Sequence, residues 1–309
     1  MSQEANCFSD DVERARERFL IACDRIGLRV TSYRSRLTQR NGHPMYCDVT
    51  RLGSPEAKRA VVLCSAAAGP AGLLGCGGAL GVITAGGIQD IPKEVGLILV
   101  HAANPGGPVW PYFADGDSPA ADGPAPAWSD GVLAAAEKRF SDFQQESGFD
   151  WTKLAGQTLA SMSPPAWDGD VLREIAADRL KGLNQICVVD PRTGPGQFGA
   201  YETVSCDPKG SAARDRADSW FAIDPAAEDR VQGAGNTPCA GGLGGLVKTA
   251  RVTNVIVEIG TYSMAGVLSG GDRKDAMRSF PSSADWRVSA WRAIRETLRR
   301  AYQGLMREG

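Results

Sequence analysis

QICVVD, residues 185–190, is an apolar run that ends on an acid, and it decides the fold. The segment behind it, residues 191–200, holds three glycines and two prolines, which predicts a loop from residue 191 onward. A short, strongly apolar strand that runs straight into a loop is typical of the inner, parallel strands of an α/β sheet. Ligands of such sheets bind outside the carboxyl ends of the strands, so Asp190 stands where a site is expected.

Strands and helices alternate on both sides of this run. Further strands are predicted for residues 28–33, 46–51, 60–64, 95–102, 201–206 and 252–259. Helices are predicted at residues 10–26 (capped by Ser9), within 65–87, and at 130–146, 170–183, 211–221 and 284–306. The alternation shows no internal repeat and no linker. It predicts a single three-layer α/β domain over residues 1–309, with a mixed, largely parallel sheet.

The composition is that of an ordinary globular protein without a strong charge. A net charge of −2 gives no general attraction for nucleic acid or for an anionic membrane, so neither is expected as a partner. Residues 1–11 are polar and acidic, unlike a signal peptide, and no run reaches the ~18 apolar residues of a membrane span. None of the eight cysteines has a metal-binding spacing, so we expect reduced core thiols in a cytoplasmic protein.

The glycine-rich stretch GCGGALG, residues 75–81, loosely resembles a dinucleotide-binding fingerprint. The true fingerprint opens directly after its strand, which this stretch does not, so close helix packing is the better explanation. Cys76 has apolar neighbours and no histidine close by in the sequence. These features favour an inert core thiol over a nucleophile.

Two short motifs are more specific. D-x-x-T-G occupies residues 190–194, and E-x-G-T-Y occupies residues 258–262. With weaker matches at 60–78 and 97–105 and in the last helix around Trp291, they make the chain resemble a bacterial branch of the zinc carboxypeptidase superfamily, a branch catalogued as a domain of unknown function. The resemblance runs nearly end to end and implies the phosphorylase/hydrolase-like fold of zinc carboxypeptidases.

The resemblance also implies a zinc site that this chain has lost. In the family, a His and a Glu from an H-G-x-E-G turn and a second His after a later strand bind zinc, and water takes the fourth position. The matching positions here are Ala68, Ala71 and Arg192. Alanine has no lone pair to offer, and a guanidinium only donates and stays protonated. We therefore expect no metal, no other cofactor and no zinc peptidase activity.

Other family positions keep residues that can act on a ligand. The candidates for catalysis are Glu258, His101 and Tyr262, and those for ligand binding are Arg192, Asp190 and Thr193. The resemblance gives Glu258 the place of the general-base carboxylate. For His101, which follows a buried strand, a structural hydrogen-bonding role is the favoured interpretation. Residues 112–124 match the family's substrate-holding stretch, yet they contain no Arg, Lys or Asn.

Arg192 has two interpretations. In the favoured one, it pairs with Asp190 or Glu258 and stabilises a pocket that no longer binds metal, because a buried carboxylate is costly without a partner. In the other, it holds a carboxylate, phosphate or oxyanion of a ligand while Glu258 accepts a proton.

Two hypotheses on function follow, and whether the protein is an enzyme stays open between them. The favoured one is a pseudoenzyme that keeps a carboxypeptidase-like fold to bind a small-molecule or peptide-like ligand, or a protein partner. The other is a metal-independent hydrolase or biosynthetic tailoring enzyme that acts on an amino-acid-like or acyl substrate. A metallohydrolase with unrecognised ligands is a third, weaker alternative.

Overall fold

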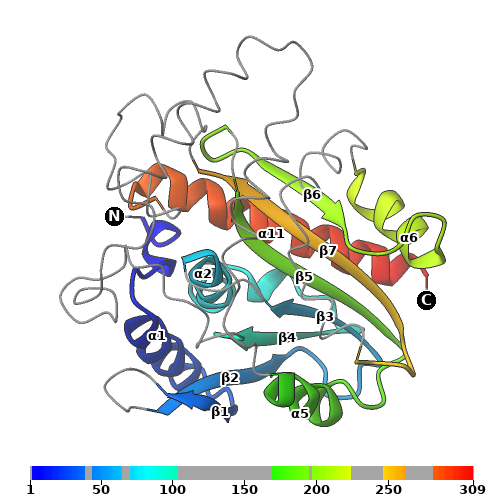
Figure 1. Cartoon of the computed structure of the whole chain (residues 1–309), viewed down its shortest axis with the longest axis horizontal. Helices are drawn as coiled ribbons and strands as arrows, with labels where there is room; N and C mark the ends of the chain where they lie inside the picture. Colours follow the sequence, from blue (N-terminus) through cyan, green and yellow to red (C-terminus); the bar gives the residue numbers. More distant parts are fainter. Residues whose placement is uncertain are drawn as a thin grey trace, which may run out of the picture.

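The seven predicted strands form one sheet in the computed structural model, in the order β1-β2-β4-β3-β5-β7-β6 (Figure 1). The structure describes residues 2–38, 44–64, 70–103, 169–194, 197–223, 246–261 and 281–308. The strands are β1 Val30–Thr38, β2 Pro44–Leu52, β3 Arg59–Cys64, β4 Val95–His101, β5 Gln185–Gly194, β6 Tyr201–Ser205 and β7 Arg251–Gly260.

The four inner strands β4, β3, β5 and β7 are parallel to their inner neighbours, whereas β1, β2 and β6 are antiparallel at the two edges. β4 is buried at every residue, and β3 at all but its first. Such continuous apolar burial is what a parallel strand covered on both faces requires. The predicted mixed α/β domain with a largely parallel centre is therefore confirmed.

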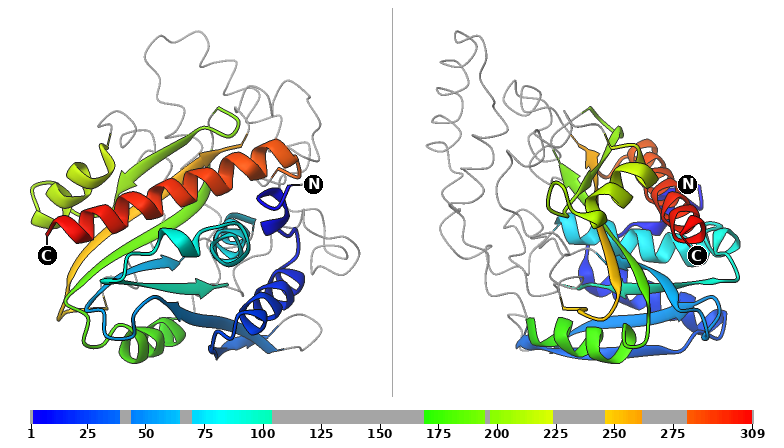
Figure 2. Two further views of the ribbon diagram at one scale, coloured as in Figure 1. Left: turned by 180° about the vertical axis from the view of Figure 1, so that it is seen from behind. Right: turned by 90° about the vertical axis from the view of Figure 1, so that its right-hand side faces the viewer.

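Helices cover both faces of this sheet (Figure 2). One face carries the helices α1 Val12–Arg25, α2 Pro70–Thr84, α6 Ala212–Phe221 and α11 Ala284–Arg307, with the short 3-10 turns η1 Ala5–Cys7 and η2 Ile88–Asp90. The other face carries α5 Gly169–Arg179. The helix predicted for residues 130–146 lies outside the described residues.

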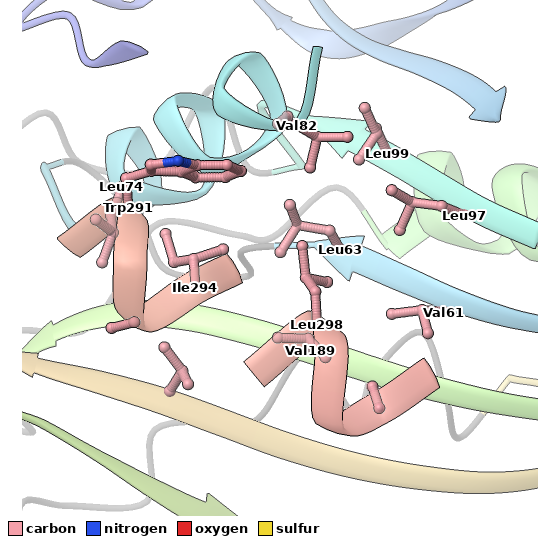
Figure 3. Close-up of a cluster of buried hydrophobic side chains, with 14 of the residues drawn as sticks. Val61, Leu63, Leu74, Val82, Leu97, Leu99, Val189, Trp291, Ile294 and Leu298 are labelled. Carbon is pink, nitrogen blue, oxygen red and sulfur yellow. The ribbon is translucent and has the colours of Figure 1, made fainter. Parts of the chain in front are cut away.

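The larger core lies between the sheet and α2 and α11 (Figure 3). Trp291 and Ile294 of α11 are fully buried and face Leu63 of β3 and Leu74 of α2. Burying each large apolar side chain of this kind contributes roughly 1.5–3 kcal/mol. The apolar stripe predicted for the last helix is thus what fixes α11 across the sheet.

The glycines of α2 allow α11 and the N-terminal segment to approach closely. A Cβ at Gly77 would lie 2.1 Å from the Phe8 ring, and one at Gly81 would lie 2.5 Å from the Trp291 ring. A Cβ at Gly78 would be 3.1 Å from the end of Ile294. Close packing, rather than phosphate binding, therefore explains the glycine-rich stretch, as the sequence predicted.

The loop predicted from residue 191 begins too early. β5 continues to Gly194, and every residue of it pairs with β7. Pro191, which suggested the loop, lies beyond Val189, the last β5 residue that pairs with β3. A proline without an N–H is tolerated where a strand needs a partner on one side only.

The cap of the first helix also differs from the prediction. Asp11, not Ser9, accepts the backbone N–H of Arg14. The Ser9 hydroxyl instead accepts a hydrogen bond of 2.9 Å from Arg18.

The arginine-rich face of α11 joins the helix to other elements. Arg287 is buried and bound to Asp10, and Arg292 pairs with Glu4. Two further arginines, Arg295 and Arg299, both bind Asp90 of η2, at 2.6 Å and 2.9 Å. Charges on this helix therefore hold the N-terminal segment and η2 in place. The sequence pattern could not show this, because the partners are distant in the chain.

The cysteines divide into two groups. Cys7, Cys23, Cys47, Cys64, Cys76 and Cys187 are free and buried, as predicted. Cys206 is disulfide-bonded, which contradicts the prediction, and its partner lies outside the described residues. Unlike the six core thiols, Cys206 follows an edge strand in a partly exposed position.

Within the described part of the chain, no helix combines the length and the apolar character needed to cross a bilayer.

The α2–α11 contact makes a testable prediction. Gly81→Ala should lower the free energy of unfolding by about 1–2 kcal/mol, because the new methyl group overlaps the rigid Trp291 ring. Gly78→Ala is the matched control. It meets only the flexible end of Ile294 and gains up to ~1 kcal/mol of helix propensity, so it should be close to neutral. Urea unfolding measures both. A Gly81→Ala variant at least as stable as the wild type would contradict the packing.

Candidate functional site

A group of charged side chains lies near the carboxyl ends of β5 and β7. Alternate residues of a strand point to the same face of the sheet. Val188 of β5 and Val252 of β7 pack on the α5 face. Asp190, Arg192 and Glu258 follow them at even spacings, so they share that face, opposite α11.

Asp190 and Arg192 form a buried ion pair. The Arg192 Nε and Nη2 atoms both donate to the Asp190 Oδ2 atom, at 3.1 Å and 2.7 Å. Asp190 is 1% exposed and Arg192 6% exposed. Burial raises the pKa of the neighbouring Cys64 thiol, and the Asp190 carboxylate raises it further, so this cysteine stays protonated. The pair is the contact expected from the first interpretation of Arg192.

Glu258 lies between a cation and an anion on the neighbouring strands. Arg192 is its register partner on β5, and Glu202 is its register partner on β6. Burial raises the pKa of Glu258 to about 7. Arg192 opposes the shift and Glu202 adds to it. A carboxyl group with a pKa near neutrality can both accept and donate a proton at physiological pH.

Two predicted site residues do not join this group. Thr193 is one residue from Arg192 on a regular strand, so its side chain points to the opposite face. His101 also belongs to the opposite face, since it stacks on Phe19 of α1 with ring centroids 4.6 Å apart. The structure therefore does not bring His101 together with Glu258.

His101 instead forms part of a buried polar cluster under α1. It is the register partner of Asp48 on β2, and both are 0% exposed. Asp48 accepts hydrogen bonds from Arg16 at 2.6 Å and 3.1 Å and from the Ser32 hydroxyl at 2.5 Å. Neither His101 ring nitrogen has a hydrogen-bond partner of good geometry among the described residues. The backbone of Ala15 interacts with the ring without reaching the geometry of a normal hydrogen bond.

The pKa of His101 is lowered to about 4. Burial is the main cause and Arg16 adds to it, whereas Asp48 and the backbone of Ala15 oppose it. His101 is therefore neutral at physiological pH and tightly packed, as a structural residue would be.

Several predicted positions lie outside what the structure describes. Tyr262 and Ala68 are outside the described residues, and Ala71 falls in α2 at a position whose side chain is not described. Within the described residues, no group of three or more His, Cys, Asp or Glu side chains is placed to hold a metal ion.

Glu202 is the site residue that sequence reasoning did not single out. The β6–β7 ladder brings Glu202 opposite Glu258, while Cys206 lies further along, where its N–H donates to the Asn254 carbonyl at 2.9 Å. The two segments, E-x-G at 258–260 and Y-E at 201–202, are far apart in the sequence, and only the antiparallel register of β6 and β7 pairs them.

These elements define a mixed α/β domain with a charged cluster at the carboxyl ends of two parallel strands. The family model described as "Protein of unknown function (DUF2817)" matches residues 8–112 and 126–307, and the chain belongs to this family. No curated protein sequence matches it.

Among solved structures, the chain is similar to two bacterial glutaminyl cyclases. One, from Fimbriiglobus ruber, is 11% identical, with 96% of this chain and 92% of that chain covered and a TM-score of 0.44. The other, from Porphyromonas gingivalis, is 13% identical, with 98% and 99% covered and a TM-score of 0.39.

The buried ion pair predicts a non-additive pair of substitutions. Arg192→Met should lower the free energy of unfolding by about 3–5 kcal/mol, because it leaves the Asp190 carboxylate buried without its arginine. The double variant Asp190→Asn/Arg192→Met should lose clearly less, since it leaves neither charge of the pair buried without the other. Arg292→Met, in the exposed pair with Glu4, is the control and should change stability by less than about 1 kcal/mol. Additive losses in denaturant unfolding would rule out the coupling.

The neutral state of His101 predicts a pH dependence of stability. Below its usual pKa of 6.5, the unfolded chain protonates His101, whereas the folded chain does not until about pH 4. The folded state therefore loses about 2–3 kcal/mol of stability at this residue between pH 7.5 and pH 4.5. In His101→Phe, which keeps the stacking on Phe19, this component should disappear. The check is the wild-type minus variant difference in unfolding free energy at the two pH values. A difference that does not change with pH would show that His101 binds a proton as readily in the folded state as in the unfolded chain.

Proposed function

We propose that this protein is a zinc-carboxypeptidase-like protein that has lost its zinc site, and that it binds a ligand in the remodelled pocket without acting as a peptidase. In this view it is a pseudoenzyme, and its ligand is a small or peptide-like molecule or a segment of a protein partner. The proposal rests on the resemblance of residues 190–194 and 258–262 to the zinc carboxypeptidase pattern.

The single observation that supports it most is the Asp190–Arg192 ion pair. Arg192 stands where the resemblance puts the third zinc ligand, and its guanidinium has no lone pair to give. Its Nη2 atom lies 2.7 Å from Asp190 Oδ2, so the carboxylate beside that position already has a cation as partner. A zinc ion of the carboxypeptidase kind does not fit these residues.

A second candidate function has an observation of its own in its favour. A metal-independent hydrolase or tailoring enzyme that acts on an amino-acid-like or acyl substrate would need a general acid–base group, and Glu258 has a pKa raised to about 7. His101 cannot assist it, because it lies on the opposite face of the sheet. Glu258 and Arg192 would then have to carry the chemistry with Tyr262, which lies outside the described residues.

Metal content tests the proposed function directly. Protein purified without chelator should contain far less than one zinc per chain, and a chelator should not change its melting temperature. The matched control is the triple variant Ala68→His/Ala71→Glu/Arg192→His, which restores the family's ligands. It should gain zinc binding but no peptidase activity, because residues 112–124 still lack the substrate-holding arginine and asparagine. One tightly bound zinc per wild-type chain would overturn the proposal.

Ligand binding separates the two candidate functions. Free and N-acetylated amino acids at millimolar concentration serve as probes in thermal-shift measurements on the wild type and on Asp190→Asn/Arg192→Met. A pseudoenzyme pocket predicts a stabilising probe that is recovered unchanged. An enzyme predicts a probe that is converted by the wild type and left intact by Glu258→Gln at an unchanged melting temperature. A probe that stabilises the double variant as much as the wild type does not bind at this cluster.

A further inference from the structure

Two neighbouring strands, β6 and β7, are joined by a connection much longer than their pairing requires. They are antiparallel and pair directly from Tyr201 with Ile259 to Ser205 with Val255, yet residues 206–250 separate them in the chain. Antiparallel neighbours need only about two to five connecting residues. The connection contains α6, which packs beside α11 on the same face of the sheet. The longer such a loop is, the more a cross-link within it restricts the unfolded chain.

The number of cysteines identifies the partner of Cys206. The chain has eight cysteines, of which six are free. Cys206 is disulfide-bonded. Eight cysteines less these seven leave one, Cys239, which belongs to the same connection and lies outside the described residues. A bond between the two closes the part of the connection that contains α6.

The six free thiols are poorly placed to exchange with this bond. Each of these cysteines is at most 4% exposed, whereas Cys206 is partly exposed. Burial raises the pKa of the Cys23 and Cys76 thiols to about 12. Burial also raises the pKa of the thiols of Cys7, Cys64 and Cys187. Exchange with a disulfide requires a thiolate, so these core cysteines do not compete for Cys206.

The backbone holds Cys206 at a fixed place on the edge of the sheet. Its N–H donates to the Asn254 carbonyl at 2.9 Å. The carboxylate of the next residue, Asp207, accepts two hydrogen bonds of 2.8 Å from the backbone and side-chain amides of Asn254. β6 is the last strand of the sheet, so no described strand pairs with its outer side. A cross-link at Cys206 therefore attaches a later part of the chain to an edge strand.

We propose that Cys206 and Cys239 form a reversible disulfide that closes the connection between β6 and β7, so that the stability of this edge of the sheet depends on the thiol redox state. To form the bond, the two thiols give up two protons and two electrons to a small-molecule disulfide such as oxidised glutathione, which is reduced to two thiols. Because Cys206 is partly exposed, small thiols can reach the bond and reduce it again.

The bond has a consequence for where the cross-linked chain occurs. A reducing cytosol keeps such thiols apart, whereas an oxidising compartment preserves the disulfide. The cross-linked chain is therefore the form expected outside a reducing cytoplasm. The inference goes beyond the proposed function and does not rest on it, because neither cysteine belongs to the charged cluster of Asp190, Arg192 and Glu258.

Peptide mapping without reductant tests the pairing on the wild-type chain. The protein is equilibrated with equal concentrations of reduced and oxidised glutathione, and free thiols are trapped with iodoacetamide. The tryptic peptides that contain Cys206 and Cys239 should then be joined to each other. In a parallel sample, the denatured chain should show six free thiols before reduction and eight after it. Eight free thiols before reduction, or a bond from Cys206 to any other cysteine or to a second copy, would overturn the inference.

Melting temperatures test what the bond does. Dithiothreitol should lower the melting temperature of the wild type by about 5–10 °C, because reduction frees the long connection. Cys206→Ser, Cys239→Ser and the double variant should all melt at this lower temperature and not respond to dithiothreitol, since each change breaks the same bond. Cys47→Ser, which leaves the bond intact, is the control and should keep the full response. A wild type that dithiothreitol leaves unchanged, or single losses that add in the double variant, would refute the role given to the cross-link.

Discussion

The buried ion pair between Asp190 and Arg192 is the constraint on which the candidate site depends. It lies near the carboxyl end of β5, an inner strand of the sheet. The Arg192 Nη2 and Asp190 Oδ2 atoms lie 2.7 Å apart in a buried position, so the two charges stabilise each other. Either charge alone would destabilise the fold there. The pair also decides the state of its neighbours. Arg192 lowers the pKa of Glu258, which lies between it and Glu202, but burial raises that pKa more strongly. Neither the packing of the strands nor the charge of the site can therefore be understood without this pair.

The sheet separates two buried polar groups with different characters. On the α1 side, Asp48 is held by Arg16 and Ser32, and His101 is neutral and stacked on Phe19. On the α5 side, Asp190, Arg192, Glu258 and Glu202 lie near the strand ends, where open α/β sheets bind ligands. The first group has the closed packing of a structural cluster. The second has a carboxyl group that is only partly buried and has a pKa of about 7, which suits an exchange of protons or contact with a ligand. The distinction assigns His101 to the framework and leaves Glu258 as the acid–base candidate.

Sequence patterns were enough for the framework and insufficient for the site. The apolar run 185–190 and the similar runs along the chain predicted all seven strands. The pattern is clearest in β3 and β4, because strands that are buried on both faces consist of continuous apolar residues. The helix at 284–306 was predicted correctly because one face of α11, with Trp291 and Ile294, is apolar and buried. The extension of β5 through Pro191 was missed, since a local rule about proline takes no account of which side of the strand has a partner. Glu202 and the faces of Thr193 and His101 were missed because they depend on register and alternation across strands that lie far apart in sequence. The disulfide of Cys206 had no signal at all in the cysteine spacing.

The central claim is that an arginine bound to an aspartate occupies the place where the resemblance would put a metal ion. Anomalous diffraction at the zinc absorption edge, from crystals of protein purified without chelator, tests it in one experiment. The account predicts no anomalous peak near the end of β5 and continuous density joining the Arg192 guanidinium to Asp190. An anomalous peak beside Asp190, with the Arg192 side chain turned away from it, would contradict the account.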